Sequence, residues 1–122
     1  HIQFLKPFGF FDYVKLQLEA KCVLSDSGTI TEESSILNFP ALNLRETQER
    51  PEGFEEASVM LVGLNPERVI QGLEVLDAQP RGKVRLLNMV DAYASQNVSD
   101  KVVRIVQSYT DVIRRKTWKS AV

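Results

Sequence analysis

The sequence predicts an α/β protein built on a mostly parallel sheet. Short apolar runs at residues 22–24, 40–44 and 58–63 are typical of buried strands. Stretches with the 3.6-residue spacing of amphipathic helices lie between and beside these runs. Strands that alternate with helices pair in parallel, and their ligands bind past the carboxyl ends of the strands. Polar clusters follow two of the predicted strands, so we expect a binding site at that edge.

Size and composition restrict the class of protein. The chain has 122 residues, enough for one domain with one core, and its net charge of −1 gives no overall basic field. We therefore expect no nucleic acid partner. The longest apolar runs are a few residues, against roughly 20 for a membrane span, and we expect no secretory leader. The single cysteine, Cys22, has no partner for an internal disulfide, so we expect a cytoplasmic protein without membrane insertion.

In the first part of the chain, residues 2–5 alternate before Pro7 and Gly9, which predicts a strand ending in a turn. The sequence thus opens in what resembles the middle of a strand, without an initiator methionine, and we expect a fragment of a longer protein. Residues 10–21 place Phe11, Val14 and Leu18 on one face of a helix. Residues 22–24 are the next strand, and residues 29–38 the next helix.

The second helix and those that follow carry recognisable start signals. Thr29 and Glu32 have the spacing of a capping box, and Asn65 before Pro66 forms an N-cap with proline at the first helical position.

The remaining segments are a short helical turn predicted at residues 49–56 and mainly loop predicted at residues 79–95. The helix after Asn65 has an apolar stripe at Val69, Ile70, Leu73 and Leu76. A long final helix at residues 98–118 carries one at Val98, Val102, Ile105, Tyr109 and Val112.

The turn at residues 27–29 connects a strand directly to a helix. Gly28 lets the backbone approach a ligand closely, and the first N–H groups of the helix offer about half a positive charge. The hydroxyls of Ser27 and Thr29 lie beside them in the sequence. This arrangement is typical of a phosphate or diphosphate site. The alternative is an ordinary turn in which Ser27 or Thr29 caps the helix. This alternative stays open because the sequence contains neither of the glycine-rich phosphate motifs GxGxxG and GxxxxGK(S/T).

The charged residues near this turn have two interpretations each. Glu33 either accepts hydrogen bonds from sugar hydroxyls or, like Glu32, only complements the helix dipole. Arg45 and Arg50 flank the loop after the next strand, and their planar guanidinium groups suit phosphate. They are equally able to form local ion pairs with Glu46, Glu49 or Glu52. His1, the only histidine, is interpreted as an exposed residue rather than a general base.

Two motifs point to one family, because both their residues and their distance along the chain match that family's pattern. SDSGTITEE at residues 25–33, Pro40 and RETQERPEG at residues 45–53 resemble the non-hydrolysing UDP-N-acetylglucosamine 2-epimerases. The resemblance runs without gaps from residue 7 to residue 63 and more loosely beyond. KPFGFFDY at residues 6–13 and NVSDKVVR at residues 97–104 are most similar to the branch that forms UDP-N-acetyl-L-fucosamine, by inverting C2 of UDP-2-acetamido-2,6-dideoxy-L-talose.

The resemblance implies a fold and a place within it. The family has a GT-B architecture of two Rossmann-like three-layer α/β/α halves, with the nucleotide sugar between them. Residues 1–122 resemble most of the carboxy-terminal, UDP-binding half, so we expect the amino-terminal domain and the start of this one to lie outside this sequence. The resemblance also implies a homodimeric full-length enzyme without a cofactor or metal, and it suits bacterial surface polysaccharide synthesis.

The family's binding residues transfer by position onto this chain. Ser27, Gly28 and Thr29 should meet the diphosphate, with Arg50 near the phosphates and Arg45 and Glu49 as weaker candidates. Glu33 should bind the ribose hydroxyls, Tyr13 should stack near the uracil, and Phe8 is a weaker base contact. Thr29 replaces the family's usual second glycine and fits only at negative φ. Gln48 replaces a threonine.

The implied reaction inverts C2 of a UDP-N-acetylamino sugar by anti-elimination of UDP, which gives a glycal-like intermediate, followed by re-addition on the other face. It needs general acid and base groups near C2 and stabilisation of the departing UDP. The family's carboxylates and histidine for this step lie outside residues 1–122, and His1 does not align with that histidine. The chain alone is therefore expected to be inactive. A GT-B glycosyltransferase domain and a non-catalytic nucleotide-sugar sensor remain as alternatives.

Overall fold

The computed structural model describes residues 1–119 and contains a sheet of three parallel strands. The strands are β1 (Val23–Ser25), β2 (Ala41–Asn43) and β3 (Met60–Leu61), and they lie side by side in that order. Val23 is opposite Ala41, and Leu42 is opposite Met60. The parallel pairing confirms the predicted α/β class. The carboxyl ends of all three strands consequently share one edge of the sheet.

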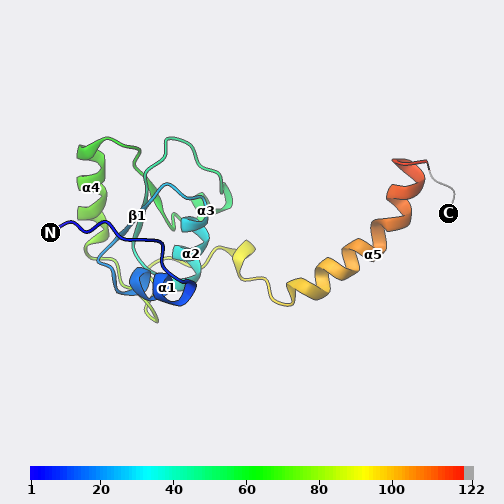
Figure 1. The fold of residues 1–122 in the computed structure, drawn as a ribbon, viewed down its shortest axis with the longest axis horizontal. Coiled ribbons are helices and arrows are strands. Elements are labelled where there is room, and N and C mark those ends of the chain that lie inside the picture. The colour runs from blue at the N-terminus through cyan, green and yellow to red at the C-terminus, as the bar shows by residue number, and fades with distance from the viewer. Residues whose placement is uncertain (120–122) are drawn as a thin grey trace.

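Helices connect and flank the strands (Figure 1). They are α1 (Phe10–Glu19), α2 (Thr29–Leu37), α3 (Glu52–Glu55), α4 (Pro66–Leu76) and α5 (Val98–Lys116), with a 3₁₀ turn, η1 (Asp91–Tyr93). The start of α4 is as predicted, because the Asn65 side chain accepts a hydrogen bond of 2.9 Å from the Glu67 N–H and Pro66 follows it. Residues 79–95 are mainly loop, also as predicted.

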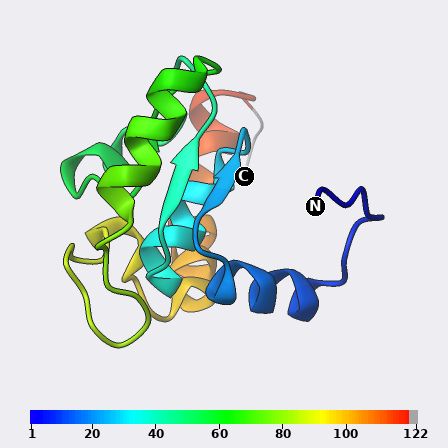
Figure 2. The same ribbon diagram turned by 90° about the vertical axis from the view of Figure 1, so that its left-hand side faces the viewer.

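The two faces of the sheet are covered by different helices (Figure 2). Ala41 packs with Ile30 of α2 and with Phe39 in the buried core. Leu42, the next residue along β2, points to the opposite face. There it meets α4 at Gly72, where a Cβ would lie 2.9 Å from a Leu42 methyl group. Helices on both faces make the three-layer, Rossmann-like arrangement that the sequence predicted.

Three strand predictions need correction. Of the predicted buried strand at residues 58–63, only Met60–Leu61 form β3, and both residues are partly exposed. Residues 2–5 form no strand, and the Phe4 side chain is 96% exposed, because nothing within residues 1–119 pairs with this segment. The run at residues 22–24 is displaced by one residue and is not fully buried. As β1 lies at the edge of the sheet, Leu24 is 43% exposed and Cys22 is only partly buried. Burial nevertheless raises the pKa of the Cys22 thiol.

Three apolar helix faces are less buried than their periodicity suggests. On α1, Phe11 is exposed, and on α4, Ile70 is exposed while Gly72 and Leu76 are buried. Helix α5 extends away from the rest of the protein, and its apolar residues Val98, Val102, Ile105 and Tyr109 are exposed (Figure 1). No helix within residues 1–119 is long and apolar enough to cross a bilayer.

Candidate functional site

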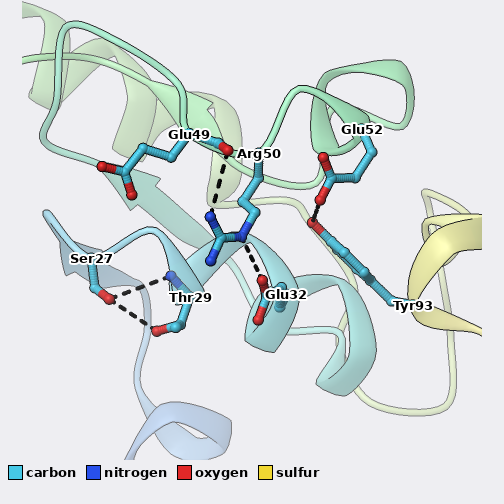
Figure 3. A network of polar contacts seen from close by, with 7 residues as sticks. All are labelled: Ser27, Thr29, Glu32, Glu49, Arg50, Glu52 and Tyr93. Atoms are coloured by element: carbon cyan, nitrogen blue, oxygen red, sulfur yellow. Dashed lines mark hydrogen bonds and ion pairs between the residues drawn. The ribbon is translucent and has the colours of Figure 1, made fainter. Parts of the chain in front are cut away.

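The turn after β1 lies at the carboxyl edge of the sheet and opens α2. Its two hydroxyl groups are adjacent: Ser27 Oγ is 2.9 Å from Thr29 Oγ1, and the Thr29 N–H donates to Ser27 Oγ at 3.4 Å (Figure 3). Gly28 has helical dihedral angles, φ −62° and ψ −33°, and Thr29 is not among the residues with positive φ. The β-branched residue therefore fits here without backbone strain. The turn presents two hydroxyls beside a helix N-terminus.

The predicted capping box is wrong. The Glu32 carboxylate does not return to the start of α2, where the N-cap residue is Gly28 and the Thr29 N–H donates to Ser27 Oγ. It accepts instead a hydrogen bond of 2.5 Å from the Arg50 Nε (Figure 3). A charge-assisted bond to a guanidinium is stronger than a bond to a neutral backbone N–H, which explains why Glu32 bonds to Arg50 rather than to the start of the helix. The motif pattern thus identified the helix start correctly and assigned Glu32 the wrong partner.

The loop after β2 reaches over the turn. A Cβ at Gly28 would lie 2.6 Å from Glu49 Oε2 and 3.6 Å from Arg50 Nη1, so both side chains lie against the turn. The hydrogen bond with Glu32, followed by its charge, raises the pKa of Arg50 and keeps the guanidinium protonated. The two polar clusters of the sequence therefore meet in space, as predicted. A guanidinium, two hydroxyls and a helix N-terminus converge at one place, together with the Glu49 carboxylate.

Arg45 forms the local ion pair that was its alternative interpretation. Its Nη2 is 2.6 Å from Glu49 Oε1, and its Nη1 donates to the Asp26 carbonyl at 3.4 Å. The side chain thereby ties the loop after β2 to the turn after β1. Arg45 supports the geometry of the site, while Arg50 contacts the Gly28 position directly.

A tyrosine anchors the far end of the same loop and was missed from the sequence. The Tyr93 hydroxyl, in η1, donates to Glu52 Oε1 at 2.9 Å (Figure 3). Burial, and then this carboxylate, raise the pKa of Tyr93 to about 12. Because 41 residues separate the two, no local pattern indicated the contact. Residues 45–52 are thus held by Arg45, Arg50 and Glu52 together.

A second polar group lies where α1 meets α2. Glu33 accepts a hydrogen bond from the Gln17 side-chain amide, and burial and the nearby charge of Glu33 raise the pKa of Tyr13. Tyr13 and Glu33, both predicted to contact the nucleoside, are therefore neighbours. Phe8 precedes α1, with 46% of its surface exposed. Within residues 1–119, no group of three or more His, Cys, Asp or Glu side chains is arranged to hold a metal.

Comparison with known proteins gives one consistent result. Residues 1–107 match the family model described as UDP-N-acetylglucosamine 2-epimerase. An epimerase of that name from Methanocaldococcus jannaschii is 31% identical over 105 residues, which are 86% of this chain and 27% of the relative. One from Neisseria meningitidis is 32% identical over 103 residues, 84% of this chain and 28% of the relative.

Solved structures agree. The structure of UDP-N-acetylglucosamine 2-epimerase from Rickettsia bellii superposes with a TM-score of 0.90 at 48% identity, covering 97% of this chain and 32% of that one. The Neisseria meningitidis enzyme, bound to UDP-GlcNAc, gives a TM-score of 0.62 at 29% identity over 85% of this chain and 28% of that one. The chain thus spans about a third or less of the length of these relatives.

Proposed function

The chain belongs to the UDP-N-acetylglucosamine 2-epimerase family, and from this we propose that it is the UDP-binding part of an enzyme that inverts C2 of a UDP-N-acetylamino sugar. The observation that carries the proposal is the convergence of Arg50 with the turn at residues 27–29. These groups lie past the carboxyl ends of parallel strands, where α/β sheets bind nucleotides. A similar epimerase has been solved with UDP-GlcNAc bound.

We assign the diphosphate to the turn and to Arg50. The N-terminus of α2 carries partial positive charge, and the hydroxyls of Ser27 and Thr29 are able to donate to phosphate oxygens. Arg50 donates Nε to Glu32 and Nη1 to the Glu49 carbonyl at 3.5 Å, which leaves Nη2 for an anion. Glu49 and Arg45 form an ion pair with each other, 2.6 Å between Oε1 and Nη2, and support this diphosphate site.

The nucleoside is assigned to the other side of the α2 N-terminus. Glu33, as a carboxylate, is an acceptor suited to a pair of ribose hydroxyls. Tyr13 lies near it on α1 and offers an aromatic face for the uracil ring. Phe8, just before α1, is the weaker candidate for a base contact. Adjacent residues of α2, Glu32 and Glu33, would then serve the phosphate and ribose ends.

In the proposed reaction this part of the enzyme holds the leaving group. Elimination breaks the C1–oxygen bond to UDP and removes the proton from C2. UDP then re-forms its bond to C1, and a proton adds to the other face of C2, which gives the epimer. Negative charge develops on the diphosphate as UDP departs, and Arg50 with the α2 dipole stabilises it. The groups that move the C2 proton are assigned to the remainder of the full-length enzyme. We propose that the full-length enzyme has the GT-B architecture and is a homodimer.

We further propose the branch that acts on UDP-2-acetamido-2,6-dideoxy-L-talose and forms UDP-N-acetyl-L-fucosamine in the bacterial cytoplasm. The support is the sequence at residues 6–13 and 97–104. Its expected role is the supply of sugar for capsule or O-antigen polysaccharide. Incubating the full-length enzyme with this substrate and with UDP-N-acetylglucosamine decides between the two branches.

Calorimetric titration of UDP into the chain tests the nucleotide site. We expect weak binding, because the full-length enzyme forms part of the nucleotide-sugar cleft from residues outside this chain. No heat of binding at millimolar UDP would contradict the proposal. For the reaction, the full-length enzyme is incubated with substrate in deuterated water. Incorporation of deuterium at C2 supports epimerisation. Transfer of the sugar to an acceptor without deuterium exchange indicates a glycosyltransferase. If neither deuterium exchange nor sugar transfer occurs, the protein is a nucleotide-sugar sensor.

A further inference from the structure

Helix α1 buries one side chain, and that side chain is polar. Most of its apolar residues are exposed, including Phe10 at 74% and Phe11 at 85%. Gln17 is 3% exposed and is the one buried residue of the helix. An amphipathic helix ordinarily buries its apolar residues. The position of Gln17 therefore requires an explanation other than hydrophobic packing.

The buried amide contacts the carboxylate assigned to ribose. Gln17 Nε2 donates to Glu33 Oε2, which joins α1 to the first turn of α2. Gln17 Oε1 is buried and has no hydrogen-bond partner in the described part of the chain. Burying an amide oxygen without a partner destabilises the folded protein, because the oxygen loses its hydrogen bonds to water. A methionine would fill a similar volume without that cost, so stability alone does not account for glutamine here.

We propose that Gln17 is a positioning residue for nucleotide binding: it fixes the Glu33 carboxylate so that its other oxygen accepts from the ribose hydroxyls. This inference rests on the proposed function of Glu33. A glutamate side chain has three rotatable bonds, and fixing it before the ligand arrives reduces the entropy lost on binding. The amide is suited to this task, because it donates to the carboxylate without neutralising its charge.

The test compares Gln17→Met with Gln107→Met, the same substitution at an exposed position of α5. UDP and 2′-deoxy-UDP are titrated into each variant and into the unchanged chain. We expect Gln17→Met to weaken UDP binding about five- to tenfold, the loss of one charge-assisted bond's positioning effect. Binding of 2′-deoxy-UDP should weaken less, so that discrimination between the two ligands falls. Gln107→Met should change neither affinity.

Gln17→Glu gives a readout that a merely structural role would not produce. Two carboxylates in contact repel when both are ionised and share a proton as the pH falls. UDP binding by Gln17→Glu should therefore be weakest above pH 7 and recover towards pH 5, relative to the unchanged chain at each pH. That comparison removes the ionisation of UDP itself from the result.

The outcomes separate the two claims. If the unchanged chain does not bind UDP, the proposed function fails and this inference fails with it. If the chain binds UDP but Gln17→Met keeps full affinity and full discrimination against 2′-deoxy-UDP, only the role of Gln17 is refuted. A pH profile of Gln17→Glu parallel to that of the unchanged chain refutes it as well, even if Gln17→Met proves too unstable to titrate.

Discussion

Arg50 and Glu32 join the loop after β2 to the first turn of α2 through a bond of 2.5 Å between Nε and Oε1. About a third of each side chain is exposed, so the pair lies at the surface rather than in the core. Glu32 engages Nε, one edge of the planar guanidinium. The pair therefore orients Arg50 towards the turn at residues 27–29, where its Nη1 also donates to the Glu49 carbonyl at 3.5 Å.

Arg50→Lys should weaken UDP binding about tenfold although the charge is kept. Lysine presents a single ammonium group and cannot bond Glu32 and a phosphate in a fixed planar geometry. Calorimetric titration of UDP measures the loss. Arg104→Lys, at an exposed position of α5, is the matched control. Undiminished affinity of Arg50→Lys would show that only the charge at this position matters.

Gly53→Ala should destabilise the fold by about 1–3 kcal/mol, because the new methyl group would overlap the Cγ2 of Thr31. Thr31 is fully buried and has no room to move away. Urea unfolding followed by circular dichroism gives the free energy of unfolding. Gly9→Ala is the control, since its nearest atom is 3.9 Å from the added Cβ. Equal stability of both variants would contradict the packing described for α2 and α3.

Ser34→Ala should cost about 1–3 kcal/mol of unfolding free energy. The buried Ser34 hydroxyl reaches the Phe39 carbonyl at 2.7 Å and the Ser58 carbonyl at 3.2 Å, which ties α2 to the segments before β2 and β3. The alanine leaves these acceptors without it. Ser108→Ala, at an exposed position of α5, should have little effect in the same unfolding experiment. A neutral result for Ser34→Ala would mean that the hydroxyl contributes nothing to the core.

The bond between Tyr93 and Glu52 predicts a dependence of stability on alkaline pH. The folded-state pKa of Tyr93, about 12, lies above its unfolded value near 10. The stabilisation is therefore fully present below pH 10 and is lost as the pH rises from 10 to 12. Thermal unfolding of the unchanged chain and of Tyr93→Phe across this range tests the prediction. Their difference in stability should shrink with rising pH; a constant difference would exclude this ionisation.

The sequence predicted most elements whose cause is local. Asn65 before Pro66 determines where α4 begins, and the alternation of strands and helices determines the parallel sheet. Burial was predicted less well, because it depends on distant segments. The run at residues 22–24 is apolar enough for a central strand, yet β1 lies at an edge. Periodicity likewise cannot say whether the apolar face of α5 meets a partner.

The site divides in the same way. The convergence of residues 27–29 with Arg50 was predicted, because both follow neighbouring parallel strands. The partner of Glu32 was not, since the capping box and the ion pair with Arg50 use the same carboxylate and the sequence does not rank them. Gln17 was missed because a polar residue within an apolar helix pattern is ordinarily taken as exposed.

The most direct test of the diphosphate site compares the binding affinities for UDP and for uridine, in the unchanged chain and in Arg50→Ala. If Arg50 and the turn hold the diphosphate, UDP binds more tightly than uridine, and Arg50→Ala removes most of that advantage while the affinity for uridine is unchanged. Glu33→Ala should instead weaken both ligands. If the advantage of UDP over uridine survives in Arg50→Ala, the diphosphate is held elsewhere and the central claim is wrong.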